Sequence, residues 1–122
     1  MNIRSLFRPA GLPGVSATDA RRLMADGAVL VDVREPSEWD AGHAPGARHV
    51  PLATVLSDAA GAPFDSTSAL ITVCRSGMRS ARAARHLRRQ GRDVRNLRGG
   101  MIAWSAAGLP VVDDRGRPGH IR

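Results

Sequence analysis

The chain has 122 residues, of which 43% are hydrophobic and 24% charged, so it can fold as one domain with a buried core. Its single cysteine excludes an internal disulfide and a zinc site built from several cysteines. No apolar stretch approaches the roughly 20 residues of a membrane-spanning helix, and Pro9 and Gly11 interrupt any signal-peptide pattern. These patterns predict a soluble protein of the cytoplasm.

The net charge is +7, and every cationic residue is an arginine. Nine arginines and one acid, Asp93, lie between residues 75 and 98, so this segment carries +8. Such a segment favours encounter with anions, either small oxyanions or phosphate backbones. A solvated helix surface is the alternative explanation. No aromatic residue lies within 75–98, so we do not expect a stacking surface for single-stranded nucleic acid there.

The first half of the chain predicts helices and strands in alternation. Ser16 and Asp19 form a capping box that opens a helix, and Gly27 closes it. The nearly continuous apolar run 28–33 is typical of a strand that is covered on both faces. A proline at its first turn favours a helix over 36–41. There follow a short strand at about 47–50, a helical turn over 51–56 and a segment of loop composition over 57–68.

The second half continues the alternation. A second buried strand, 69–73, ends at Cys74, and Arg79–Gln90 is helical in propensity. The remaining predicted elements are a weak strand at 94–97, a tight turn at Gly99–Gly100, a helix over 101–107 and a polar, mobile tail. Strands that alternate with helices predict an α/β fold with a parallel sheet and helices on both of its faces.

Cys74 stands at the carboxyl end of a predicted strand, which is where parallel sheets bind ligands. The loop after it reads C-R-S-G-M-R-S. Gly77 lets successive backbone N–H groups turn inward, and the following helix N-terminus adds positive partial charge. Together with Arg75 and Arg79, these features predict a lowered pKa and a reactive thiol. The alternative is a buried structural cysteine.

Other polar residues receive structural interpretations. We expect Asp32 and Arg34, at the end of a buried strand, to pair and hold loops together. His43 is expected to hydrogen-bond locally within a turn. The other histidines lack metal-ligand spacing with one another or with Cys74, so we infer no metal and no cofactor. Gly99–Gly100 is expected to line the pocket, and Trp104 to pack in the core.

Three blocks of the sequence resemble the rhodanese family of sulfurtransferases. The loop over 74–80 resembles the family's active-site loop. Upstream, D-V-R-E-P-S-E-W-D-A-G-H-A-P-G-A at 32–47 resembles its first signature. Downstream, L-R-G-G-M-I-A-W at 97–104, followed by A-G-L-P, resembles its closing signature. Trp39 and Ala44 depart from the commoner family residues, and neither touches the chemistry.

The resemblance implies a single rhodanese-like domain over 15–111, with a central parallel sheet of about five strands. Residues 1–14 are then an N-terminal extension and 112–122 a polar C-terminal tail. Only four residues separate Cys74 from Arg79. The related cell-cycle phosphatases and arsenate reductases carry one more, and the shorter loop suits sulfur rather than phosphate.

The implied activity is that of a thiosulfate sulfurtransferase. The Cys74 thiolate attacks the outer sulfur of thiosulfate, releases sulfite and keeps a persulfide, which cyanide or an external thiol then takes up. Arg75 matches the family's donor-binding cation, Ser76 matches the position of a second cation in some members, and Arg79 helps to fix the loop's shape. The expected substrate-binding loop comprises Arg75, Ser76, Gly77, Met78 and Arg79.

The expected partners are a small anionic sulfur donor and an external acceptor, without a membrane or a nucleic acid. An acidic protein partner stays an alternative. Two other functions also stay open. One is a rhodanese-like binding or regulatory module without turnover, against which the intact Cys74 argues. The other is a sulfur carrier that docks on an acidic partner or on tRNA through the arginines of 75–98, which would make binding sensitive to salt.

Overall fold

The computed structural model describes residues 13–57 and 67–122, so the predicted extension and the predicted loop at 57–68 fall mostly outside it. The described residues form a five-stranded sheet in which every pairing is parallel, in the order β1-β5-β4-β2-β3. This confirms the predicted α/β fold. The strands are β1 (Gly14–Val15), β2 (Val29–Asp32), β3 (Arg48–His49), β4 (Leu70–Val73) and β5 (Val94–Leu97).

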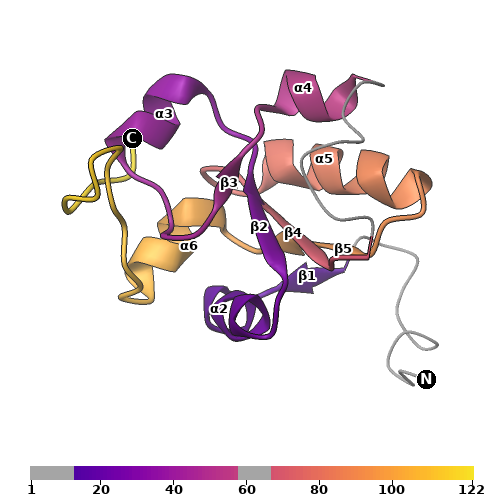
Figure 1. The fold of residues 1–122 in the computed structure, drawn as a ribbon, viewed down its shortest axis with the longest axis horizontal. Helices are drawn as coiled ribbons and strands as arrows, with labels where there is room; N and C mark the ends of the chain where they lie inside the picture. Colours follow the sequence, from indigo (N-terminus) through magenta and orange to yellow (C-terminus); the bar gives the residue numbers. More distant parts are fainter. Residues whose placement is uncertain (1–12, 58–66) are drawn as a thin grey trace.

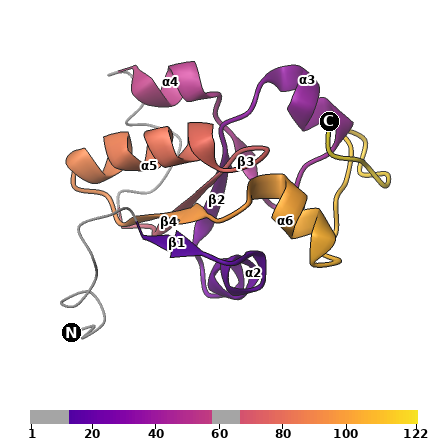
Figure 2. The same ribbon diagram turned by 180° about the vertical axis from the view of Figure 1, so that it is seen from behind.

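Helices cover both faces of this sheet, as the sequence predicts (Figures 1 and 2). One face packs against α4 and α5, and the other against α2 and α6. Along β2 and along β4, successive side chains therefore point alternately into two separate hydrophobic clusters, one on each face of the sheet. Both strands are covered on both faces. The helices are α2 (Ala17–Ala25), α3 (Pro36–Ala41), α4 (Leu52–Leu56), α5 (Met78–Arg89) and α6 (Gly100–Ala106).

The predicted helix signals act where the sequence places them. The Ser16 hydroxyl accepts a hydrogen bond from the Asp19 backbone N–H at 3.1 Å and caps α2. In α3, Pro36 occupies the first turn, and Glu35 and Glu38 form a reciprocal capping box. The observed ends of α5 and α6 lie one residue before the predicted ones.

Among the elements of the described residues, strand β1 is the one that the sequence pattern does not indicate. Its two residues are too few to show a period, and their partners are 82 residues away, since Gly14 lies opposite Asn96 and Val15 opposite Leu97. The Arg98 guanidinium also donates to the Gly14 carbonyl at 3.0 Å. Pairing with β5 therefore creates this strand, rather than local propensity.

The last residues of the chain lie against the domain, and the prediction of a mobile tail is wrong. Val112 pairs with both His43 and Pro118 in antiparallel bridges, and the His120 backbone N–H donates to the Ala41 carbonyl at 3.0 Å. Gly42 has no room for a Cβ, which would collide with the backbone of His120. The polar composition of 112–122 conceals this docking because backbone groups make it.

Candidate active site

Cys74 follows β4 directly and is 1% exposed. The loop after it turns at Gly77, whose φ of +118° lies in the left-handed region where a side chain would be strained, and α5 begins at the next residue. The sulfur therefore lies at the carboxyl edge of the sheet and at the N-terminus of a twelve-residue helix. This is the position that the sequence predicts.

Two donors reach the sulfur directly. The Gly77 backbone N–H donates to Cys74 Sγ at 3.0 Å, and the Ser80 Oγ lies 3.3 Å from the same atom. Burial raises the pKa of the Cys74 thiol, but hydrogen bonds from the Ser80 hydroxyl and from the backbone N–H groups of Ser80, Gly77 and Ser76 outweigh it. The pKa therefore lies below its usual value, which favours the thiolate.

The direction of this shift agrees with the sequence-based expectation, and its cause agrees in part. The sequence points to backbone N–H groups of the loop, the helix N-terminus and the charges of Arg75 and Arg79. Backbone N–H groups do lower the pKa, and the Ser80 hydroxyl contributes the largest lowering instead of the two arginines. Arg79 directs its guanidinium to Glu38 of α3, with N···O distances of 2.7 and 2.9 Å. The Arg75 Nε donates to the Arg122 carbonyl at 3.2 Å.

Asn96 of β5 belongs to the site, although the sequence analysis did not single it out. Its Oδ1 lies 2.6 Å from the Ser80 Oγ, and its Nδ2 donates to the Gly77 carbonyl at 3.1 Å. It thus contacts both residues whose donors reach the Cys74 sulfur. The Ser80 hydroxyl has one proton, which it can donate either to this amide oxygen or to Cys74 Sγ. No local pattern marks such a residue, because its role depends on β5 lying beside β4 in the sheet.

The N-terminal turn of α6 holds the outer side of the Cys74 loop. The backbone N–H groups of Met101 and Ile102 donate to the carbonyls of Cys74 and Arg75 at 2.8 and 3.1 Å. Gly100 makes this approach possible, since a Cβ there would collide with those two carbonyl groups. Within a trans peptide the N–H and the carbonyl point in opposite directions. Because the carbonyls of Cys74 and Arg75 face α6, the N–H groups of the same two peptides face the side of the loop where the sulfur lies.

The other predicted loop residues lie at the surface around this sulfur. Arg75 and Ser76 are exposed, and Met78 is 83% exposed. Arg79 is half-buried in its pair with Glu38, which joins α5 to α3. The predicted substrate-binding residues therefore fall into two groups, exposed side chains at the opening of the loop and backbone groups that face the sulfur.

Asp32 and Arg34 form the pair that the sequence predicts, and both side chains are fully buried. The Arg34 Nε and one terminal nitrogen donate to the two carboxylate oxygens, and that nitrogen also donates to the Gly42 carbonyl at 2.7 Å. His43 bonds the Trp39 carbonyl through Nδ1 at 2.8 Å and stacks on the Trp39 ring. These residues support the turn after α3 and do not contact Cys74.

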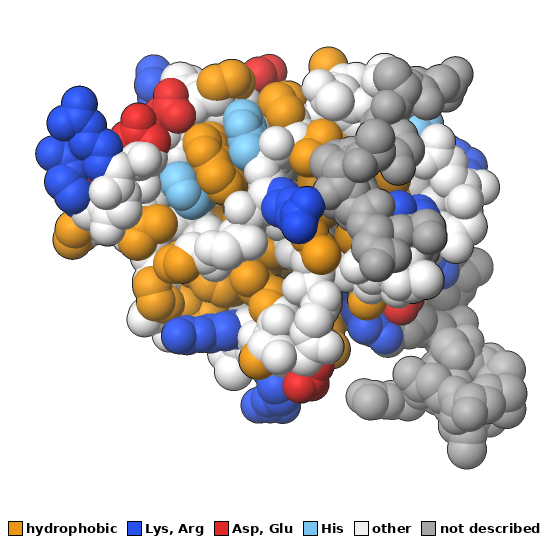
Figure 3. Space-filling view, viewed as in Figure 1, with side chains coloured by type: hydrophobic (Ala, Val, Ile, Leu, Met, Phe, Trp, Pro, Cys, Tyr) orange, Lys and Arg blue, Asp and Glu red, His pale blue; other side chains and the backbone are white. Residues whose placement is uncertain are grey.

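A separate cavity of about 300 Å³ lies on the other face of the sheet, between α2 and α6. Figure 3 shows hydrophobic side chains gathered over these two helices. Trp104 lines this cavity, is 2% exposed and donates from Nε1 to the Pro110 carbonyl at 2.8 Å. None of the lining residues belongs to the Cys74 loop; they are Arg21, Met24, Ala25, Pro45, Trp104 and Pro110.

Within 13–57 and 67–122, no three His, Cys, Asp or Glu side chains come together as metal ligands would. None of the helices there has the length and apolar character that crossing a bilayer requires.

Comparison with known proteins places this geometry in a family. The profile of the family described as "Rhodanese-like domain" matches residues 16–107. A sulfurtransferase of Allochromatium vinosum is 40% identical over 89 residues, which cover 72% of this chain and 81% of the relative. The thiosulfate sulfurtransferase GlpE of Pseudomonas paraeruginosa is 36% identical over 91 residues, with coverage of 74% and 81%.

A solved structure agrees with this assignment. The crystal structure of a rhodanese-related protein from Thermoplasma volcanium superposes with a TM-score of 0.74 at 25% sequence identity. The match covers 82% of this chain and 97% of that one. The five-stranded parallel sheet and its helices are therefore the fold of the domains that this chain resembles in sequence.

Proposed function

This chain belongs to the rhodanese-like domain family, and from that premise we propose that it is a sulfurtransferase in which Cys74 carries the transferred sulfur. The observation that carries the proposal is the environment of this thiol. Its sulfur accepts a backbone N–H at 3.0 Å and lies 3.3 Å from a serine hydroxyl, and its pKa is lowered by these bonds. A cysteine with only a packing role needs no such donors.

The proposed reaction has two displacements. In the first, the Cys74 thiolate attacks the outer sulfur of thiosulfate, the S–S bond breaks, and sulfite leaves with the electron pair. In the second, cyanide or a thiolate attacks the outer sulfur of the persulfide. The electron pair of the broken S–S bond then returns to Cys74 as a thiolate, and thiocyanate or an acceptor persulfide leaves. Neither step needs an external oxidant.

The residues around the sulfur support both displacements. The backbone N–H groups of Ser76 and Gly77 and the Ser80 hydroxyl stabilise negative charge on the thiolate, and the same groups would stabilise a persulfide. Arg75 is exposed at the opening of the loop, where it could attract the anionic end of the donor. The lowered pKa of Cys74 increases its thiolate fraction, which reduces the need for a general base.

Intact-protein mass spectrometry tests this proposal. Incubation with thiosulfate should add one sulfur to the wild type, cyanide should remove it, and the Cys74→Ser variant should gain none. If thiosulfate adds no sulfur, incubation with polysulfide separates a different donor preference from a domain that binds without turnover. A chain that accepts sulfur from neither would contradict the proposed activity. The cytoplasmic location expected from the sequence stays a prediction.

A further inference from the structure

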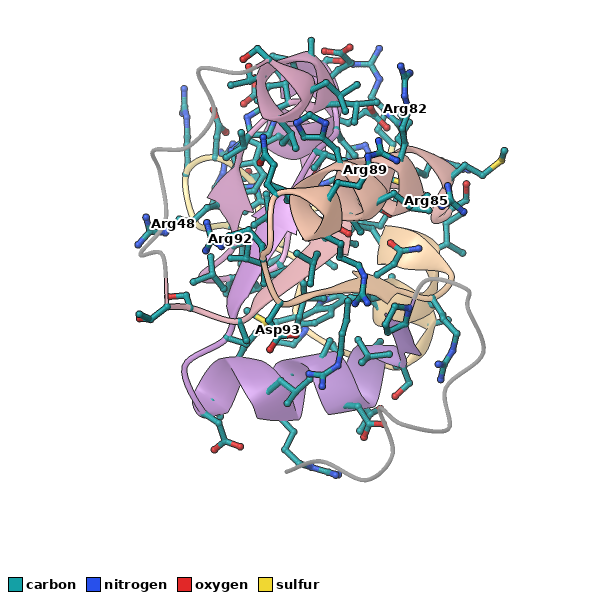
Figure 4. All side chains as sticks on the ribbon, turned by 90° about the vertical axis from the view of Figure 1, so that its right-hand side faces the viewer. Arg48, Arg82, Arg85, Arg89, Arg92 and Asp93 are labelled. Atoms are coloured by element: carbon teal, nitrogen blue, oxygen red, sulfur yellow. The ribbon has the colours of Figure 1, made fainter. Side chains whose placement is uncertain are left out.

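The solvent-facing side of α5 is a continuous strip that begins beside the Cys74 loop. Met78, Arg82, Arg85 and Arg89 recur at spacings of three and four residues and are all exposed. The opposite side of the helix is buried and consists of Ser80, Ala83, Ala84 and Leu87. Figure 4 shows Arg82, Arg85 and Arg89, which we name the arginine stripe, projecting from α5 away from the sheet.

The charge of the arginine stripe is not compensated by the described part of the chain. Its three guanidinium groups take part in none of the ion pairs of residues 13–57 and 67–122. Arg82 and Arg85, and Arg85 and Arg89, stand three and four residues apart, where like charges on a helix repel. Asp93 lies on the sheet side of α5 in Figure 4, away from the stripe. Positive potential is therefore available to an external partner.

The opening of the Cys74 loop adds apolar surface to this charge. Among the described residues, Met78 at 83% and Ile102 at 43% are the exposed large hydrophobic side chains. Both border the loop, since Met78 follows Gly77 and the Ile102 N–H donates to the Arg75 carbonyl. Helix α5 is about 18 Å long, so apolar and cationic contacts lie within the footprint of one protein partner.

We propose that this surface, formed by Met78, Ile102 and the arginine stripe, docks an acidic protein whose thiol receives the sulfur from Cys74. The inference rests on the proposed function. The chain has no second cysteine, so the acceptor thiol must come from outside. The acceptor thiolate attacks the outer persulfide sulfur, the electron pair returns to Cys74, and the acceptor leaves as a persulfide.

An acidic protein suits this surface better than a nucleic acid does. Nucleic acids without a fixed sequence are bound by cationic grooves combined with aromatic side chains on which bases stack. No Phe, Tyr or Trp lies on α5, and its one histidine, His86, is half-buried and lies 3.3 Å from Gln90 Nε2. Trp104 is buried, and His43 and His49 stack on Trp39. Methionine and isoleucine beside a reactive sulfur match an apolar contact with protein, and the arginines supply steering and specificity.

The test measures sulfur transfer from the persulfide-loaded protein to two peptides that end in cysteine, one of glutamates and one of glutamines of equal length. At low ionic strength we expect the wild type to transfer sulfur to the acidic peptide about tenfold faster than to the neutral one. The variant R82Q/R85Q/R89Q should lose this preference. The matched control R21Q/R22Q/R115Q removes the same charge from exposed positions elsewhere and should keep it.

Two results would overturn the proposal: equal preference in the wild type and the stripe variant, or equal loss in both triple variants, which would mean that only net charge matters. A binding experiment separates these failures from a failure of the proposed function. Fluorescence anisotropy of the acidic peptide, with serine in place of its cysteine, is measured on the unloaded protein. Weaker binding by the stripe variant alone supports the surface even if no persulfide forms, whereas binding of tRNA but not of the peptide contradicts it.

Discussion

At the scale of single residues, the reactivity of Cys74 depends on one neighbouring hydroxyl. Ser80 is fully buried, lies 3.3 Å from the sulfur and is held by Asn96 at 2.6 Å. Its carbonyl also accepts a bond from the Thr72 hydroxyl at 2.9 Å, so the residue is fixed from β4 and β5 at once. The hydroxyl has one proton and several acceptors around it, and negative charge on the sulfur favours donation to Cys74 Sγ over donation to Asn96 Oδ1.

Replacing this hydroxyl should therefore weaken the thiolate. In Ser80→Ala the pKa of Cys74 should rise, because burial then opposes ionisation with one fewer donor to balance it. At pH 7 the thiolate fraction falls, and persulfide formation should slow roughly tenfold. The pH dependence of alkylation by iodoacetamide measures the shift. Ser105→Ala, at an exposed position of α6, is the matched control, and an unchanged alkylation midpoint in Ser80→Ala would contradict the assignment.

The ion pair between Glu38 and Arg79 makes a second prediction at this scale. The Arg79 guanidinium lowers the pKa of Glu38 from 4.5 to about 2. A carboxylate whose pKa is lowered by folding stabilises the protein above its unfolded pKa, and this contribution disappears as the pH falls from about 4.5 to about 2. Because the Arg79 side chain is 38% exposed, solvent screening reduces the expected contribution to about 1 kcal/mol.

Urea unfolding of wild type and Glu38→Gln measures this contribution. At pH 7 the variant should be less stable by about that amount, and the difference should shrink as the pH approaches 2. A difference that stays constant over this range would show that Glu38 acts through packing rather than through its charge.

At the scale of secondary-structure elements, the Cys74 loop is held between the start of α5 and the start of α6. Gly77 opens α5 in the left-handed region, and Gly100, with a φ of +61°, lets α6 approach the loop. The two N–H groups that α6 donates to the loop carbonyls would otherwise have no partner at a helix N-terminus. One contact therefore satisfies the helix end and orients the catalytic loop.

Substitution of Gly100 tests this contact. Gly100→Ala should lower the free energy of unfolding by about 2–4 kcal/mol, because it combines an unfavourable φ with a collision against the loop carbonyls. Gly91→Ala is the matched control, since Gly91 also has a positive φ, +87°, but open space around it, and should cost only about 1–2 kcal/mol. Urea unfolding compares the two, and equal losses would mean that the close approach is not important.

At the scale of the whole molecule, a buried ion pair connects the sheet to the segment that ends the chain. Arg34 bonds Asp32 at the end of β2 and the Gly42 carbonyl after α3, and Gly42 lies against the backbone of His120. Segment 112–122 then reaches the Cys74 loop, where the Arg122 carbonyl accepts a bond from Arg75. Residues far apart in the sequence thus stabilise one side of the active site.

Breaking this pair on one side should be costly. Arg34→Ala leaves the Asp32 carboxylate buried without its partner, and we expect a loss of about 3–5 kcal/mol in the free energy of unfolding. The double variant Asp32→Asn/Arg34→Met removes both charges at similar volume and should recover at least about 1 kcal/mol of that loss. Urea unfolding measures the free energy of unfolding of both variants. If the double variant is less stable than Arg34→Ala, the loss in Arg34→Ala does not come from the unpaired Asp32 charge.

Much of this protein follows from local sequence. The elements 28–33, 69–73 and 79–90 are predicted within one or two residues, because apolar runs and apolar periodicity are local signals. The signals at Ser16 and Pro36 likewise mark the starts of α2 and α3. The position of Cys74 at a strand end, and the glycine that turns its loop, follow in the same way. The family resemblance rests on these same residues.

Tertiary structure decided the rest, because the remaining partners meet only through the strand order of the sheet. Asn96 reaches Ser80 because β5 lies beside β4, and Glu38 reaches Arg79 across 41 residues because α3 packs near the start of α5. Strand β1 and the docking of 112–122 likewise depend on backbone groups of distant segments. Local propensity carries no information about such partners. The hydrogen bonds that lower the pKa of Cys74 come from its own loop and the start of α5, but the contact of Asn96 with Ser80 and Gly77 depends on the strand order of the sheet.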